Sequence, residues 1–205
     1  MTVDRGGLPA DGFAFARQVH GADVVLATRA GWQGQADVLM TERPGLPLAI
    51  FTADCVPIVV YDRTNRRLAM AHAGWRGTVE AAARAAVHAL AEAGGRPEAF
   101  LAALGPSIGP CCYEVDAPVI ARLDAAYPDT GRAWVTATRP GRWMLDLWKA
   151  NEDQLEDAGL ERAQIDNPRL CTACRADLFF SYRRGRGEGR LVTLAAIPDG
   201  SGPAC

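Results

Sequence analysis

Short apolar runs, bounded by glycine, proline, asparagine or aspartate, predict several strands along the chain. These runs cover residues 24–28, 36–40, 48–52, 58–61, 67–72 and 100–104. Two later runs, 178–182 and 191–197, are separated by a stretch rich in arginine and glycine, which predicts a pair of strands joined by a turn. The segment GWQGQ at residues 31–35 is predicted to be a loop.

Apolar positions at helical spacing predict three helices. The first covers residues 78–93, with Thr78 as its cap, and the other two follow Asp116 and Asp146. The apolar face of the first helix consists of Val79, Ala82, Ala83, Ala86, Val87 and Leu90. Strands therefore occur both as neighbours and on either side of helices, which predicts an α+β fold with a mixed sheet.

The composition predicts a single globular domain that binds neither nucleic acid nor a membrane. The chain has 205 residues, 49% of them hydrophobic, which suits one domain spanning residues 1–205. The net charge is −2 and no long basic block occurs, so we expect no binding to nucleic acid. No apolar segment has the length of a membrane span, and the first residues do not have the pattern of a signal peptide. We therefore expect a cytoplasmic monomer or homodimer with reduced cysteines.

The stretch HAGWRG, residues 72–77, lies at a predicted join between a strand and a helix. His72 ends the strand, while His20 and Cys55 occupy two other strand–loop junctions, where a fixed backbone can aim side chains into one pocket. Two imidazoles and one thiolate are suitable ligands for a catalytic zinc ion, which keeps a fourth position open. We therefore predict a Zn²⁺ site formed by His20, Cys55 and His72, with Cu²⁺ as a substitute metal.

The spacing of these three residues leaves other interpretations open. No tight histidine pair is present, and a cysteine next to valine is often a small buried hydrophobe. Cys55 could also act as a nucleophile, with His72 or His20 as its base, as in a cysteine hydrolase. Cys55 and His72 are catalytic candidates in either case.

Arg76 follows His72 by about one helical turn and is predicted to bind phosphate or carboxylate through its guanidinium group. Gly74 and Gly77 would let the backbone approach a ligand, and the start of the following helix would add a positive dipole end. The alternative is that Arg76 simply pairs with Glu80, four residues further along.

Two aspartates complete the candidate site. Asp54, which precedes Cys55, could orient a ligand histidine or carry a proton, and the alternative is an ordinary turn residue. Asp37 is a weaker candidate of the same kind and is grouped with the substrate-binding residues.

The other cysteines are interpreted as structural or incidental. Cys171 and Cys174 form a CxxC pair, but no second CxxC pair or nearby histidine accompanies it. Cys111 and Cys112 are adjacent in a loop rich in glycine and proline.

Six ordered motifs resemble those of the YfiH-type family. They are QVHGADV, TADCVPIVVYD, AHAGWRGTV, IGPCCYEV, LDLWKANEDQL and LFFSYRRGRGEGR, and together they extend from Gln18 to the C-terminal region. That family was first called multicopper polyphenol oxidoreductase or laccase-like, and is now described as purine nucleoside phosphorylases with adenosine deaminase activity. The resemblance implies a layered α/β/β/α-type sandwich, similar to a toxin cysteine-hydrolase domain.

By this resemblance the zinc ligands fall on His20, Cys55 and His72. The implied substrates are a purine nucleoside (adenosine, inosine or methylthioadenosine) and phosphate. The family usually has a longer segment before the first motif than the 17 residues found here, so the domain is expected to be short at its N-terminus. A multicopper oxidase needs a second, histidine-rich copper site, and the one remaining histidine, His88, cannot form it.

Two further functions stay open at this stage. One is a cysteine-type amide hydrolase or peptidoglycan-editing factor that uses Cys55 and His72. The other is a family member without catalytic activity, which would follow if part of the pocket were missing.

Overall fold

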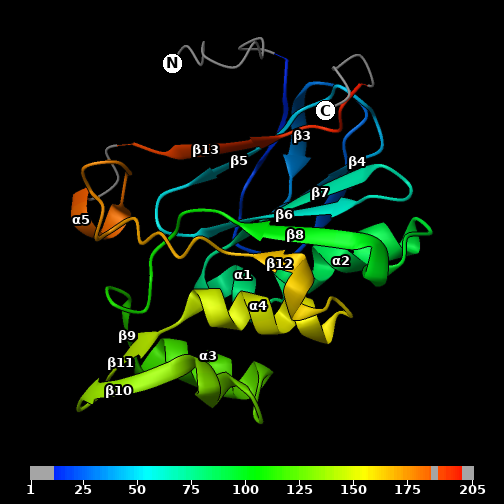
Figure 1. Ribbon diagram of the computed structural model, residues 1–205. Coiled ribbons are helices and arrows are strands. Elements are labelled where there is room, and N and C mark those ends of the chain that lie inside the picture. Colours follow the sequence, from blue (N-terminus) through cyan, green and yellow to red (C-terminus); the bar gives the residue numbers. More distant parts are fainter. Residues whose placement is uncertain (1–11, 186–188, 200–205) are drawn as a thin grey trace.

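The computed structural model describes residues 12–185 and 189–199, which form two large sheets, one small sheet and five α-helices (Figure 1). The strands of the two large sheets are β1 (Ala14–Arg17), β2 (Val24–Leu26), β3 (Gly31–Gln35), β4 (Val38–Thr41), β5 (Leu48–Thr52), β6 (Val56–Asp62), β7 (Arg67–Ala73), β8 (Phe100–Leu104), β12 (Ile165–Asp166) and β13 (Leu191–Ala195). The helices are α1 (Trp75–Val79), α2 (Ala82–Glu92), α3 (Ala117–Ala126), α4 (Leu147–Asp157) and α5 (Tyr182–Gly185). Short 3₁₀ turns lie at Pro97–Ala99, Gly131–Trp134 and Arg162–Gln164.

Both large sheets are mixed. The six-stranded sheet has the order β12-β8-β6-β7-β4-β2, and the four-stranded sheet has the order β13-β5-β1-β3. In the larger sheet β6 pairs antiparallel with β7 and β8, while β2 pairs parallel with β4. In the smaller sheet β1 pairs parallel with β3 and β5, while β13 is antiparallel to β5. The predicted α+β class with a mixed sheet is confirmed.

The six-stranded sheet lies between the four-stranded sheet and the helices (Figure 1). Because side chains alternate along a strand, Leu68 and Met70 of β7 pack toward the four-stranded sheet, whereas Ala69 and Ala71 pack toward α2. Both faces of β7 are buried, which explains why its sequence is a continuous apolar run. The site described below therefore stands on a rigid central strand.

Helix α2 buries the apolar face that the sequence predicts, but it does not begin at Thr78. The helical segment starts as α1 at Trp75, and Ala81 then interrupts it with a left-handed backbone (φ 62°). Thr78 is fully buried, and its hydroxyl accepts a hydrogen bond from the Asn151 side chain of α4 (3.1 Å). Thr78 thus anchors α1 against α4 instead of capping a long helix.

Two other predictions from the pattern are wrong. Residues 31–35 form β3, which pairs with β1, and residues 178–182 form turns that lead into α5. Leu178 and Tyr182 are 59% and 62% exposed, so their apolar side chains do not mark a buried strand face. The strand β13, expected to pair with that segment, pairs with β5 instead.

None of the three strands of the small sheet was predicted from the sequence. It has the order β10-β11-β9, formed by Val135–Arg139, Arg142–Leu145 and Glu114–Asp116, and it lies beside α3 below α4 in Figure 1. Most residues of β10 are exposed and polar, so this strand carries little periodic hydrophobic signal. Among the helices of the described ranges, none combines the length and the apolar character needed to cross a bilayer.

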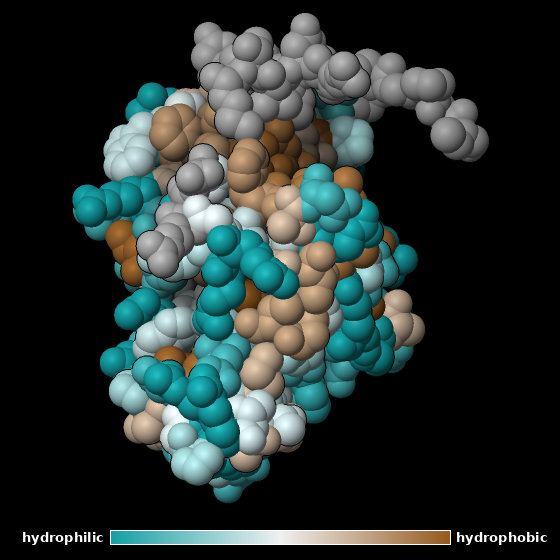
Figure 2. Space-filling model, turned by 90° about the vertical axis from the view of Figure 1, so that its left-hand side faces the viewer, coloured by the Kyte–Doolittle hydropathy of each residue, from teal (hydrophilic) through white to brown (hydrophobic). Residues whose placement is uncertain are grey.

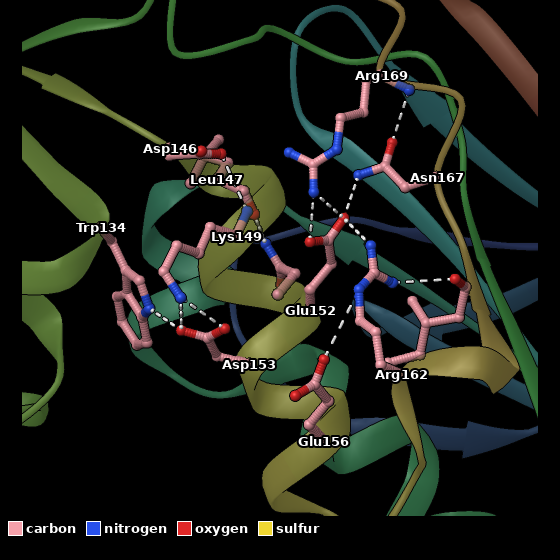
Figure 3. Close-up of polar contacts among 12 residues, drawn as sticks. Trp134, Asp146, Leu147, Lys149, Glu152, Asp153, Glu156, Arg162, Asn167 and Arg169 are labelled. Atoms are coloured by element: carbon pink, nitrogen blue, oxygen red, sulfur yellow. Dashed lines mark hydrogen bonds and ion pairs between the residues drawn. The ribbon is translucent and has the colours of Figure 1, made fainter.

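An ionic cluster around Glu152 ties α4 to the segment that follows β12 (Figure 3). The Glu152 carboxylate is nearly buried and accepts hydrogen bonds from Asn167 (2.6 Å) and from Arg169 (2.6 and 2.9 Å), with Arg162 at 3.4 Å. Charge-assisted bonds of this kind are stronger than neutral ones. They hold the chain leading to Cys171 against the helical layer.

Replacement of Glu152 with alanine is expected to lower the free energy of unfolding by about 1–3 kcal/mol, because the bonds are lost while both arginines keep access to water. Glu156→Ala on the same helix is the matched control, since Glu156 has only a 3.8 Å contact with Arg162, and it should change stability by about 0.5 kcal/mol or less. Urea unfolding of both variants checks this. Equal effects would contradict the importance assigned to Glu152.

Candidate metal centre

His20, Cys55 and His72 come together where two neighbouring strands in the middle of the six-stranded sheet, β6 and β7, have their ends. Cys55 immediately precedes β6, and His72 lies near the end of the antiparallel neighbour β7, where it pairs with Pro57. The loop after β1 brings His20 to the same strand ends. One ligand atom from each of the three residues lies within 4.8 Å of the others, and the two imidazole rings are 4.9 Å apart at 70°.

Asp37 fixes the position of His20. Its carboxylate accepts hydrogen bonds from the backbone N–H groups of Val19 (3.0 Å), His20 (2.9 Å) and Gly21 (2.7 Å). These bonds hold His20 in a left-handed conformation (φ 65°), which is uncommon for a residue other than glycine. Strained backbone of this kind costs about 1–3 kcal/mol and is most often found at functional sites.

Asp37 also orients His72. The Asp37 Oδ1 atom lies 2.8 Å from Nδ1 of His72, so Nε2 is the ring nitrogen left for a metal. Burial alone would raise the pKa of Asp37, but the hydrogen bonds from His72, Gly21, Val19 and His20 lower it below its ordinary value. Asp37 is fully buried and both of its oxygens are engaged. Asp37 is thus placed to position the two histidines. The sequence grouped it with the substrate-binding residues, but neither of its oxygens is free to bind a substrate.

The three candidate ligands influence one another strongly. Burial would raise the pKa of the Cys55 thiol, but hydrogen bonds and charge interactions with His20 and His72 lower it to about 7. Burial would lower the pKa of His72, but its bonds to Asp37 and Cys55 raise it to about 9. Two imidazole nitrogens and a sulfur this close together form a donor set that fits zinc, a metal that takes a fourth ligand in its tetrahedral catalytic sites.

Two glycines of HAGWRG let these elements approach. A Cβ atom on Gly74 would lie 2.6 Å from Cys55 Sγ and 3.4 Å from His20 Cδ2. A Cβ atom on Gly77 would lie 2.9 Å from the His72 carbonyl oxygen. Gly74 therefore leaves space beside the sulfur, and Gly77 allows α1 to pack closely against the end of β7.

Asp54 supports the loop that carries Cys55. It has a left-handed backbone (φ 89°), and its side chain accepts hydrogen bonds from the Thr172 hydroxyl (2.7 Å) and the Arg183 backbone N–H (2.7 Å). Among the contacts of the described residues, none joins the Asp54 carboxylate to a histidine. Asp54 therefore does not orient His20 or His72, as the sequence suggested it could.

Arg76 lies on α1 with its guanidinium group 4.5 Å above the ring of Trp75. The predicted alternative partner, Glu80, instead forms an ion pair with Arg122 (3.2 Å). Helix α1 has only five residues, so the long helix dipole expected behind Arg76 is not formed. Arg76 itself remains exposed.

Tyr113 and Arg183 are two residues near the site that the sequence reading did not select. The Arg183 guanidinium lies 5.1 Å from the ring of Tyr113 and donates to the backbone carbonyls of Cys112 and Glu114. Burial and the charge of Cys55 raise the pKa of Tyr113, so its phenol stays protonated. The signal available is their place in the motifs IGPCCYEV and LFFSYRRGRGEGR; Arg183 lies in the stretch rich in arginine and glycine that the sequence predicts to be a turn.

These elements meet on one face of the molecule. The loop after β8 and helix α5 lie at the left in Figure 1, and Figure 2 shows that side from the front, with hydrophobic and hydrophilic residues interspersed. Phe180 (47% exposed) and Tyr182 flank Ser181, which is buried. The face thus combines aromatic and basic side chains next to the candidate metal ligands.

Replacement of Asp37 with asparagine is expected to weaken metal binding about 10–100-fold, because such outer partners orient and polarise ligand histidines. The exposed Asp166→Asn is the control, since Asp166 lies at the far edge strand β12. Competition with a fluorescent zinc chelator measures the dissociation constant. Equal affinities for the two variants would show that Asp37 does not support the ligands.

Comparison with known proteins gives a consistent result. The family model described as multi-copper polyphenol oxidoreductase laccase matches residues 2–198. The purine nucleoside phosphorylase YlmD of Geobacillus stearothermophilus is 38% identical over 204 residues, which cover 91% of this chain and 72% of the relative. A purine nucleoside phosphorylase of Deinococcus radiodurans is 41% identical over 194 residues, covering 94% of this chain and 73% of the relative.

Solved structures agree with this comparison. The protein YfiH of Bacillus licheniformis superimposes with a TM-score of 0.89 at 33% identity, covering 93% of this chain and 76% of that one. The YlmD structure from Geobacillus stearothermophilus superimposes with a TM-score of 0.88 at 35% identity, covering 94% and 76%.

Proposed function

Because the chain belongs to the family described as multi-copper polyphenol oxidoreductase laccase, in which curated relatives are named purine nucleoside phosphorylases, we propose that it is a zinc-dependent purine nucleoside phosphorylase. Its substrates would be adenosine, inosine or methylthioadenosine together with phosphate, and adenosine deamination would be a second activity. The observation that carries the proposal is the convergence of His20, Cys55 and His72, with Tyr113 near enough to sense the charges of Cys55, Arg76 and Arg183.

His20, Cys55 and His72 would hold the metal, and Asp37 would keep both imidazoles in place. A zinc ion bound by these residues would supply Lewis acidity to a phosphate or water oxygen. Cys55 would bind as the thiolate, in line with the lowered pKa of its thiol. Because Gly74 has no side chain, its backbone approaches the sulfur without a clash.

Arg76 and Arg183 would bind the phosphate. A guanidinium group matches the geometry of phosphate oxygens, and stacking on Trp75 and Tyr113 limits the orientations that each arginine can adopt. Within the described ranges neither guanidinium forms an ion pair with a carboxylate, so their charge is available to an anion.

Tyr113 would contact the nucleoside. Its phenol is protonated and can donate a hydrogen bond to the purine that leaves the anomeric carbon. Asp54 would act mainly by holding the loop of Cys55, because both of its oxygens already accept hydrogen bonds. Oxygen-reducing laccase chemistry is not part of the proposal, since the chain has three histidines and His88 is exposed on α2.

The test is an assay of zinc-loaded protein with adenosine, with and without phosphate. Phosphorolysis predicts adenine and ribose 1-phosphate only when phosphate is present, and deamination predicts inosine in both cases. Arg183→Ala should raise the KM for phosphate more than the KM for adenosine, whereas the exposed Arg139→Ala, on the small sheet, should change neither. If neither adenine nor inosine is formed, the proposed function is wrong.

The contact of Cys55 with two histidines also favours a second candidate, a cysteine-type amide hydrolase with His72 as the base. Alkylation distinguishes the two. For the metal enzyme, bound zinc should protect Cys55 from iodoacetamide and chelation should expose it. For the hydrolase, the metal-free protein should cleave amide substrates and lose that activity when Cys55 is alkylated.

A further inference from the structure

Four cysteines that are distant in the sequence gather in one cluster. Cys111 and Cys112 lie in the loop between β8 and β9, while Cys171 and Cys174 lie between β12 and α5. Their sulfur atoms all lie within 4.8 Å of one another. The Sγ atom of Cys174 is 3.5 Å from that of Cys111 and 3.4 Å from that of Cys112. Interpreting these residues as incidental, as the sequence suggested, misses the fact that folding joins the two pairs.

We propose that Cys111, Cys112, Cys171 and Cys174 form a second metal site, a structural zinc centre with four thiolate ligands. In a tetrahedral site with zinc–sulfur bonds of about 2.3 Å, the sulfurs are about 3.8 Å apart. The cluster needs only small shifts to reach that spacing. An iron–sulfur cluster would put several iron atoms between the ligands and would need a wider arrangement.

The backbone around Cys171 has the hydrogen bonds expected at a thiolate. The N–H of Gly109 donates to Cys171 Sγ (3.2 Å), and the backbone of Cys174 is also directed to this sulfur, as in a CxxC turn. Such donors offset the negative charge that remains when four thiolates bind one Zn²⁺. Each thiol gives up its proton to solvent as its sulfur–zinc bond forms.

The proposed centre would join two loops that support the candidate active site. Ser107 and Cys171 form a parallel bridge, in which Thr172 N donates to Ser107 O (3.0 Å) and Ser107 N donates to Leu170 O (3.2 Å). Thr172 then bonds to Asp54, next to Cys55. A metal at the four cysteines would therefore stabilise the position of Asp54 without touching a substrate.

This centre shares no ligand with the set of His20, Cys55 and His72, so the two can be counted separately. Protein purified without a metal-binding tag, under reducing conditions, should contain two zinc ions per chain by elemental analysis. Cys174→Ser and Cys55→Ser should each contain one, and the double variant should contain none. Because the two single variants remove different ions, each serves as the control for the other.

Cobalt substitution provides a spectroscopic measurement of the ligand set, in addition to the count of metal ions. Protein loaded with two Co²⁺ ions should show intense thiolate-to-cobalt absorption of a four-sulfur tetrahedral site, and this absorption should persist in Cys55→Ser. One metal per chain in the wild type, unchanged in Cys174→Ser, would overturn the proposal. Mass spectrometry gives a second outcome that would overturn it. A mass two hydrogens below that of the reduced chain, in protein purified with thiol reductant, would mean that a stable disulfide occupies the same sulfurs.

Discussion

Replacement of Cys55 with serine is expected to lower kcat/KM for adenosine phosphorolysis on the order of 10³-fold. Cys55 supplies the sulfur of the ligand set found among the described residues, and both histidines direct interactions to it. A serine hydroxyl is a far weaker zinc ligand than a thiolate, so His20 and His72 alone should not retain the ion. Several kcal/mol of transition-state stabilisation would be lost, and each 1.36 kcal/mol corresponds to a factor of about ten.

The measurement is initial-rate kinetics of Cys55→Ser with the metal content determined in the same sample. Cys205→Ser is the matched control, because it makes the same chemical change at a cysteine that lies outside the six sequence motifs. Circular dichroism should show that both variants are folded. Phosphorolysis at the wild-type rate by a Cys55→Ser protein that has lost one metal ion per chain would refute the role given to this thiolate.

Replacement of Gly74 with alanine is expected to have the second largest effect. Gly74 has an extended backbone (φ −77°, ψ −176°), which alanine adopts without strain. The difficulty is spatial, since the new methyl group would lie 2.6 Å from Cys55 Sγ. Either the sulfur or the start of α1 must move, and overpacking of this kind costs about 1–3 kcal/mol. Displaced from His20 and His72, the sulfur should bind metal at least about tenfold more weakly.

Gly185→Ala is the control for this variant, because a Cβ atom on Gly185 would have no neighbour within 4 Å among the residues that the structure describes. Zinc affinity and kcat should fall in Gly74→Ala and stay unchanged in Gly185→Ala. Retention of wild-type zinc affinity by Gly74→Ala would mean that the space beside Cys55 is not needed for the metal.

Strands β5 and β7 could be predicted because packing on both faces leaves a continuous apolar pattern, and β8 could be predicted although one of its faces is partly exposed. β5 and β8 have the bounds expected from the sequence, and β7 differs by one residue at its end. The interruption at Ala81 could not be predicted, because it depends on the anchoring of Thr78 by Asn151 of α4, more than 70 residues away. The same holds for β13, whose partner β5 is chosen by tertiary packing.

The candidate ligands could be selected from the sequence because the chain has only three histidines and because His20, Cys55 and His72 lie at predicted strand–loop junctions. What the sequence did not reveal is the support around them. Asp37 could be named, but its bonds to three backbone N–H groups depend on the left-handed turn at His20. The four-cysteine cluster was hidden because its two halves lie in different loops, each unremarkable alone.

Anomalous diffraction from crystals of the intact protein, recorded on both sides of the zinc absorption edge, shows whether His20, Cys55 and His72 bind one zinc ion. We expect a zinc peak within bonding distance of the imidazole nitrogens of His20 and His72 and of the sulfur of Cys55, with one coordination position open to a ligand. Crystals grown with zinc that show no peak between these three side chains would contradict it.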